Sequence, residues 1–297
     1  MLQKMGIKTM LSTLLAAALM AGCAAGEGME PANSVYYWRT ELRLDSMESA
    51  FLKDYDIHKF YCRYFDVVMS DGAKKGPVPN ATITFPAPDD LPQGVELVPT
   101  VYITEDCMHQ PHEELAGRLV QRIVQMNETN GISGVRELEI DCDYTERSRA
   151  VYYAFLEEVR REAADRGLSL STTIRLHQLQ MPVPPADYGV LMLYNTGDPR
   201  RFDERNPVLD LRDVRPYVRY LADYRLPLAA AYPVFRWVRQ VQGVRIEHTV
   251  EADEILAVKA LVEQKRPDLA HSIVIYHLDK ENINRYSKET YEAIFHH

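Results

Sequence analysis

Acidic side chains alternate with uncharged ones along residues 137–143, which read Glu-Leu-Glu-Ile-Asp-Cys-Asp. Alternation with a period of two predicts a β-strand, in which successive side chains point to opposite faces. One face would carry four acids: Glu137, Glu139, Asp141 and Asp143. Because neighbouring carboxylates repel each other and resist burial, we expect this face to look into a solvated or ligand-filled space. Such an arrangement indicates a catalytic or binding role for the acids more than a stabilising one.

Paired carboxylates are what the cleavage of a glycosidic bond requires. One must be protonated so that it can donate to the leaving oxygen, and the other must carry charge. Crowding of like charges raises the pKa of one of them. We predict this role for Asp141 and Asp143, at the carboxyl end of the strand. Glu137 and Glu139 have an alternative, which is ion pairing with Arg or Lys on neighbouring strands, and for Glu137 we favour it.

The elements that must position these acids follow an alternation of apolar strand-like runs and helical patterns. Strands are expected at residues 35–39, 59–68, 96–103, 137–143, 168–174, 188–194, 226–232 and 272–276. Helices are expected at residues 45–55, 113–130, 147–166, 210–223, 251–263 and 283–295, the first with Asp45 and Glu48 spaced as a capping box. A short strand at residues 81–85 interrupts a Pro- and Gly-rich excursion.

Eight β/α units with apolar strands predict an α/β fold, a single-domain (β/α)8 TIM barrel. The alternative is an open doubly wound sheet. That fold normally has a glycine-rich phosphate loop after the first strand, whereas Arg39-Thr-Glu-Leu stands there.

Polar and aromatic residues gather where the expected strands end, which is where TIM-barrel active sites lie. Sugar rings stack on aromatic faces, and their hydroxyls need polar partners. The expected substrate-binding residues are Trp38, Arg63, Asp66, Glu139, Arg175, Asn195, Tyr232 and Tyr276. For each aromatic residue the alternative is plain core packing.

The N-terminal segment has the features of an export signal. Lys4 and Lys8 precede an apolar run at residues 10–20, which is too short to span a bilayer well. Cys23 directly follows Ala-Gly, and this resembles the lipobox of bacterial lipoproteins, in which the cysteine is lipidated after cleavage. We therefore expect a signal peptide at 1–22, a lipidated tether at 23–33 and the barrel at 34–297, anchored in the bacterial cell envelope. The alternative is an ordinary signal peptide with an incidental cysteine.

Composition narrows the ligand classes. The net charge of -9 argues against nucleic acid as a partner. Cys62, Cys107 and Cys142 cannot all pair with one another, and we expect Cys62 and Cys142 to be buried in strands. The chain has no Cys-x-x-Cys or His-Glu-x-x-His spacing, so neither zinc nor another cofactor is expected. Clustered carboxylates leave calcium or magnesium open.

Residues 136–143 resemble the D-x-x-D-x-D-x-E motif of glycoside hydrolase family 18, the chitinase-like TIM barrels. Glu139 and Asp141 stand in the place of the two inner aspartates, and Asp143 in the place of the terminal glutamate. Met192-Leu-Tyr194-Asn195 is similar to the family's M-x-Y-D, and residues 226–232 resemble its seventh strand. Arg63-Tyr-Phe-Asp66 resembles a bacterial lipoprotein family of unknown function.

The resemblance implies substrate-assisted cleavage of an N-acetylated glycan. Asp143 would protonate the glycosidic oxygen, Asp141 would orient the acetamido group, and Tyr194 would hydrogen-bond its oxygen. Asp143 is one methylene shorter than the family's Glu, which motivates a second reading, a non-catalytic glycan-binding lipoprotein. A third reading is a structural or assembly lipoprotein. It predicts Arg63 or Arg175 within bonding distance of Asp141 and Asp143, with no open pocket.

Overall fold

The computed structural model describes residues 30–71, 76–198, 205–241 and 244–296. One compact unit spans Pro31–His297, and β1 begins at Asn33, the last residue assigned to the tether. The expected signal peptide and Cys23 lie outside the described residues. Within the described ranges, no helix combines the length and apolar character needed to cross a membrane.

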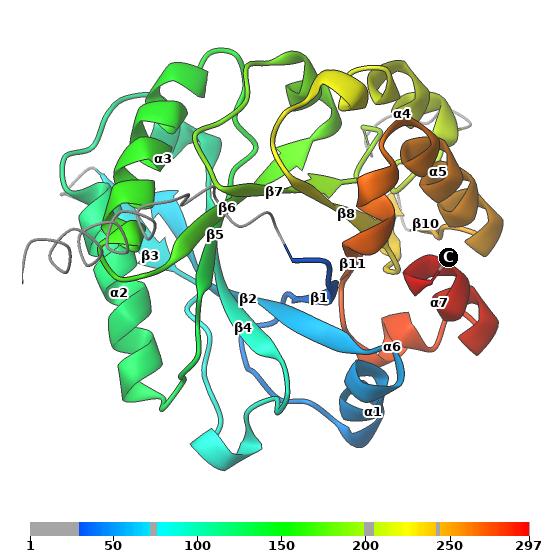
Figure 1. Cartoon of the computed structure of the whole chain (residues 1–297), viewed down its shortest axis with the longest axis horizontal. Helices are drawn as coiled ribbons and strands as arrows, with labels where there is room; N and C mark the ends of the chain where they lie inside the picture. The colour runs from blue at the N-terminus through cyan, green and yellow to red at the C-terminus, as the bar shows by residue number, and fades with distance from the viewer. Residues whose placement is uncertain (1–29, 72–75, 199–204, 242–243, 297) are drawn as a thin grey trace, which may run out of the picture. The chain divides into compact units, whose positions relative to one another are not determined.

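Eight parallel strands form a closed barrel, as Figure 1 shows. They are β1 (Asn33–Tyr37), β2 (Ile57–Met69), β4 (Glu96–Ile103), β5 (Glu137–Asp141), β6 (Ser169–Arg175), β7 (Tyr188–Met192), β8 (Leu228–Pro233) and β11 (Ile273–Tyr276). The ring is closed because β1 pairs with β11 on one side and with β2 on the other. An open sheet would leave its edge strands unpaired, so the TIM barrel is confirmed.

Helices cover the outside of this barrel (Figure 1). They are α1 (Ser46–Asp54), α2 (Leu115–Thr129), α3 (Arg149–Ala164), α4 (Leu211–Val218), α5 (Ala252–Lys265), α6 (Lys280–Ile283) and α7 (Lys288–Phe295). The capping box of Asp45 and Glu48 at the start of α1 is confirmed. The last expected helix is divided in two, since Ser287 caps a new helix, α7.

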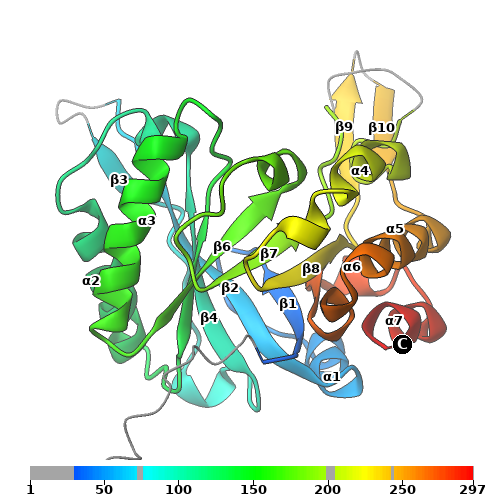
Figure 2. The same cartoon turned by 45° about the horizontal axis from the view of Figure 1, so that its top comes forward.

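Two local elements differ from the expectations. The short strand of the Pro-rich excursion is β3 (Pro77–Asn80), antiparallel to the end of β2, whereas Thr84 forms an isolated bridge with Glu41. A hairpin of β9 (Trp237–Val241) and β10 (Val244–His248) follows β8, and it was not predicted. Figure 2 shows it standing away from the barrel strands. Charged residues interrupt the apolar pattern of this hairpin in the sequence, so periodicity does not show its strands. In the structure, Arg236 pairs with Glu247 at 2.8 Å.

Gly189 provides a test of how tightly the wall of the barrel is packed. A Cβ at this position would lie 2.7 Å from Cδ2 of Leu228 and 2.8 Å from Cδ2 of Leu226. We expect Gly189→Ala to lower the free energy of unfolding by about 1–3 kcal/mol through overpacking. Urea-induced unfolding followed by circular dichroism measures the change.

Gly117→Ala in α2 is the matched control, because its new Cβ would meet its nearest neighbour at 3.8 Å. Alanine favours a helix over glycine by about 0.5–1 kcal/mol, so this variant should be at least as stable as the wild type. Equal stability of the two variants would contradict the packing argument.

Candidate active site

The acids of β5 line the interior of the barrel, and the expectation that they face a solvated space is wrong for three of them. Glu137, Glu139 and Asp141 are 2%, 0% and 3% exposed. The interior of an eight-stranded barrel is filled by side chains and excludes bulk water. Each of these carboxyl groups must therefore find its partners on other strands of the barrel.

Glu137 is neutralised by an ion pair. Lys59 Nζ of β2 lies 2.5 Å from its Oε2, and the Tyr61 hydroxyl donates to its Oε1 at 3.3 Å. The ion pair that we favoured for Glu137 is thus confirmed, and this residue belongs to the structure of the barrel rather than to its chemistry.

Glu139 is held by hydroxyl groups. The Tyr36 hydroxyl donates to it at 2.6 Å and the Thr100 hydroxyl at 3.0 Å. Burial raises the pKa of Glu139 well above its usual 4.5, although the hydrogen bond from Tyr36 opposes the shift. Expected to bind substrate, Glu139 instead lies in the closed interior and forms the layer beneath Asp141.

Asp141 and Asp143 are joined by Arg175 at the end of β6. Arg175 Nη2 lies 3.5 Å from Asp141 Oδ1, and Arg175 Nε donates to Asp143 Oδ1. Thr173 also donates to Asp141, at 2.6 Å. Burial raises the pKa of Asp141, with the Asp143 charge adding to the shift and the Arg175 charge opposing it. Burial disfavours the charge on Arg175, but Asp141 and Asp143 outweigh it and raise the pKa of the guanidinium.

Asp143 differs from the other three acids in its environment. Its side chain is 48% exposed, and it lies just beyond the end of β5 at Asp141. The described structure therefore places one buried and one solvated carboxylate side by side at the mouth of the barrel, the end at which the parallel strands terminate. Contrasting environments give the two members of a carboxylate pair different roles, and the buried member, here Asp141, is the one whose pKa is raised.

An aromatic cluster lies beside the carboxylates. Tyr194 and Tyr276 stack with ring centroids 4.6 Å apart, and Trp38 lies 5.7 Å from Tyr276. Phe235, which follows β8, completes the cluster at 5.4 Å from Tyr276. Phe235 was not predicted as a site residue, because it lies beyond the strand expected at residues 226–232.

A pocket of about 280 Å³ opens next to Asp143 and Arg175. Its other lining residues are Leu176, His177, Met192, Tyr194, Asn195, Thr196 and Tyr217. The buried hydroxyl of Tyr194 has no hydrogen-bond partner within the described part of the chain. Tyr217 belongs to α4 and was missed, because helix periodicity alone does not show which helix reaches the mouth.

This pocket is not lined by Trp38, Tyr276, Asp141 or Glu139, nor by the remaining predicted residues Arg63, Asp66 and Tyr232. Arg63 pairs with Asp66 and its guanidinium lies 5.5 Å from the Trp38 ring, so both belong to the neighbouring wall of the mouth. Tyr232 is fully buried. Burial raises its pKa, and the charge of Glu263 on α5 raises it further. Tyr232 therefore lies on the helix side of β8, away from the pocket.

Metal binding finds no support among the ranges that the structure describes. No group of three His, Cys, Asp or Glu residues there is arranged to hold a metal ion. Cys62 and Cys142 are buried free thiols, as expected.

The closed barrel resembles solved structures of chitinases and related enzymes. A chitinase from Chromobacterium violaceum superposes with a TM-score of 0.59 at 12% identity, over 89% of this chain and 98% of that chain. The spore cortex-lytic enzyme SleL of Bacillus megaterium gives 0.58 at 13% identity, over 91% and 75%. A chitinase catalytic domain from Ostrinia furnacalis, in complex with an N-acetylglucosamine oligosaccharide, gives 0.53 at 12%, over 89% and 95%.

The fold is that of the chitinase-like TIM barrels. The similarity in fold that the motifs indicated is thus confirmed. No protein-family model matches the sequence, and no curated protein matches it. Since one barrel fold hosts many activities, function has to be argued from the site itself.

The raised pKa of Glu139 has a consequence for stability. Above the unfolded value near 4.5, the folded chain holds a proton that the unfolded chain releases, so Glu139 lowers the free energy of unfolding as pH rises from 4.5 towards its folded pKa. We expect Glu139→Gln to flatten this decline, by up to about 1.4 kcal/mol for each pH unit within the window.

Urea unfolding of both proteins at a series of pH values from 4 to about 8 measures the difference. The glutamine amide can still accept from Tyr36 and donate to Thr100, so the packing is retained. A difference in stability between the two proteins that is independent of pH would contradict the assignment.

Proposed function

We propose that this chain is a glycoside hydrolase-like protein that binds an N-acetylated glycan at the mouth of its barrel and cleaves it with acid assistance. The observation that carries this proposal is the pairing of buried Asp141 with exposed Asp143 beside an open pocket. The oligosaccharide complex of the Ostrinia furnacalis catalytic domain, which has the same fold, is consistent with it.

The aromatic cluster supports a sugar as the ligand. The Tyr276 ring lies 4.6 Å from that of Tyr194 and 5.7 Å from that of Trp38, and the Asp143 carboxylate and the Arg175 guanidinium line the pocket beside Tyr194. A sugar presents apolar C–H faces and hydroxyl groups, so it needs both kinds of partner. The unpaired Tyr194 hydroxyl is a donor that an acetamido oxygen would satisfy.

The proposed reaction has two steps. Asp143 donates a proton to the glycosidic oxygen while the acetamido oxygen of the substrate attacks the anomeric carbon and the glycosidic bond breaks. Asp141 holds the acetamido N–H and stabilises the positive charge that develops on this group. Water then opens the cyclic intermediate, and its proton returns to Asp143.

Binding without cleavage is the second candidate, and the Arg175 contact favours it. A proton donor must carry a proton, and the group whose pKa burial raises is Asp141, whereas the proposed donor Asp143 is exposed and accepts from the Arg175 guanidinium. Asp143 is also shorter than glutamate by one methylene group, and a displacement of about 1 Å can cost about a hundredfold in rate.

The structural or assembly reading is supported only in part. Arg175 does lie within bonding distance of Asp141 and Asp143, as that reading predicts. The pocket of about 280 Å³ beside them is not filled, however, and this favours a ligand site. Arg63 pairs instead with Asp66.

Asp143→Asn distinguishes the first two candidates. We expect the detergent-solubilised full chain to hydrolyse a chito-oligosaccharide, and Asp143→Asn to lower kcat by at least about a hundredfold through loss of the acid. Product chromatography measures turnover, and calorimetry measures binding of the same glycan.

Asp165→Asn, at the exposed end of α3, is the control and should retain turnover. Binding by both wild type and Asp143→Asn without any turnover would establish the second candidate instead. If neither protein binds a glycan from a panel of N-acetylated and neutral oligosaccharides, both candidates are wrong.

We further propose that Cys23 carries a lipid that anchors the barrel in the cell envelope. The basic start, the short apolar run and Ala-Gly before Cys23 support this. We expect Cys23→Ala to move the chain from the membrane fraction to the soluble fraction of a bacterial host, as measured by immunoblotting. An unchanged distribution would count against the anchor.

A further inference from the structure

The seam between β1 and β11 is short. The two strands are in register at two residue pairs, Ser34 with Val274 and Val35 with Ile275. One further backbone bond follows, from Leu278 N–H to the Tyr36 carbonyl at 2.8 Å. Trp38 lies beyond the paired residues of β1, and Tyr276, the last residue of β11, pairs with Pro233 of β8 rather than with β1. The β1–β11 ladder therefore does not by itself fix the two rings relative to each other.

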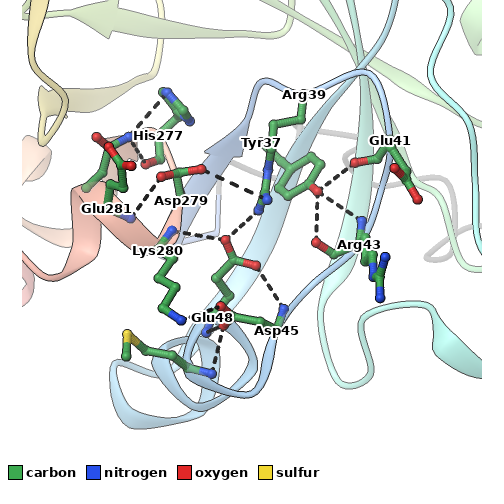
Figure 3. Close-up of polar contacts among 12 residues, drawn as sticks. Tyr37, Arg39, Glu41, Arg43, Asp45, Glu48, His277, Asp279, Lys280 and Glu281 are labelled. Atoms are coloured by element: carbon green, nitrogen blue, oxygen red, sulfur yellow. Dashed lines mark hydrogen bonds and ion pairs between the residues drawn. The ribbon is translucent and has the colours of Figure 1, made fainter.

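Glu48, from the first turn of α1, ties the two sides of this seam together (Figure 3). Its Oε1 accepts from Arg39 Nη2 at 2.5 Å and from the Lys280 backbone N–H at 3.1 Å. Its Oε2 accepts from the Asp45 backbone N–H at 2.9 Å. One carboxylate thus connects the chain after β1, the start of α1 and the start of α6.

The capping box accounts for one of these three contacts. A capping glutamate needs only the N-cap N–H, here that of Asp45, and commonly remains in water. Glu48 is instead 1% exposed. A buried carboxylate is costly unless it is paired and hydrogen-bonded, so Arg39 and Lys280 N–H are what makes this burial tolerable.

Arg39 and the chain after Tyr276 are further restrained on the outer side of the seam. The Arg39 guanidinium lies 4.4 Å from the Tyr37 ring centroid and 4.0 Å from the Asp279 carboxylate. Asp279 in turn caps α6 through the Glu281 N–H at 2.9 Å. His277 is half-buried nearby, and desolvation lowers its pKa below the usual 6.5, so at neutral pH it adds no charge to the cluster.

The rings of Trp38 and Tyr276, which together form what we call the sugar platform, belong to residues next to these restrained segments. Trp38 directly precedes Arg39, and Tyr276 is four residues before Lys280. We propose that Glu48 is a positioning residue, which holds Trp38 and Tyr276 at their 5.7 Å separation so that together they receive a sugar ring. The positioning can be tested in the free protein, whereas its purpose rests on the proposed glycan function.

Trp38 fluorescence reports the positioning. The chain has two tryptophans, so Trp237→Phe in the hairpin leaves Trp38 as the single reporter. In this background, we expect Glu48→Ala to shift the Trp38 emission to the red and to increase its quenching by acrylamide. We expect the Kd for a chito-oligosaccharide to weaken about tenfold, or about 1.4 kcal/mol.

Asp45→Ala is the matched control. It removes the other half of the capping box, the side chain that accepts from Met47 and Glu48 N–H, together with an exposed 3.9 Å contact with the Lys280 ammonium. It leaves the Asp45 N–H and the contacts of Glu48 with Arg39 and the Lys280 N–H. We expect it to lower the melting temperature and to leave the Trp38 emission and quenching unchanged. Arg39→Ala breaks the link from the other side and replaces Glu48→Ala if that variant does not fold.

The outcomes separate the positioning from the function. If Glu48→Ala and Arg39→Ala alter Trp38 no more than Asp45→Ala does, Glu48 is only a cap and the inference is overturned. If the Trp38 signals change as expected but the wild type binds no glycan, the positioning stands and the proposed function fails. A changed Trp38 signal with unaltered glycan affinity overturns the purpose assigned to the platform.

Discussion

Burying carboxyl groups inside a barrel is the constraint on which this structure depends. Three acids of β5 enter a space without bulk water, where an unpaired charge would cost several kcal/mol. Each is compensated in its own way. Glu137 has the Lys59 ammonium, Glu139 has hydroxyls and a raised pKa, and Asp141 has Thr173 and Arg175. The strands that carry these partners can occupy only one order and register around β5.

The compensation changes along β5 and thereby separates structure from chemistry. At the lower end of β5, an ion pair compensates the charge of Glu137, and in the middle Glu139 is desolvated. Beyond the upper end, the side chain of Asp143 is 48% exposed. Arg175 links the buried Asp141 to Asp143 and so sets the charge of the site.

The mouth is assembled from loops and strand ends that the barrel brings together. Stacking of Tyr194 on Tyr276 joins β7 to β11, and Glu48 joins the segments after β1 and β11. Tyr276 is the last residue of β11, and the other contacting residues lie outside the barrel strands, where strand pairing does not dictate positions. This chain shares a fold at 11–13% identity with chitinases and a spore cortex-lytic enzyme because the ladder and the interior layers define the fold, while the residues above them define the ligand.

The sequence by itself determined the barrel, because eight apolar runs alternating with amphipathic helices leave few other solutions. It also placed Asp141, Asp143, Arg175 and Tyr194 at strand ends, and those four do meet. It misjudged the acidic face of β5, since alternation shows which residues share a face but not whether that face is wet. Only the tertiary structure decided this, because the partners of Glu139 are Tyr36 and Thr100, distant in sequence and neutral. Phe235 and Tyr217 could not be predicted either, because their neighbours in the site are also distant in sequence. The role of Glu48 depends on contacts with Arg39 and Lys280, which form only once β1 and β11 close the ring.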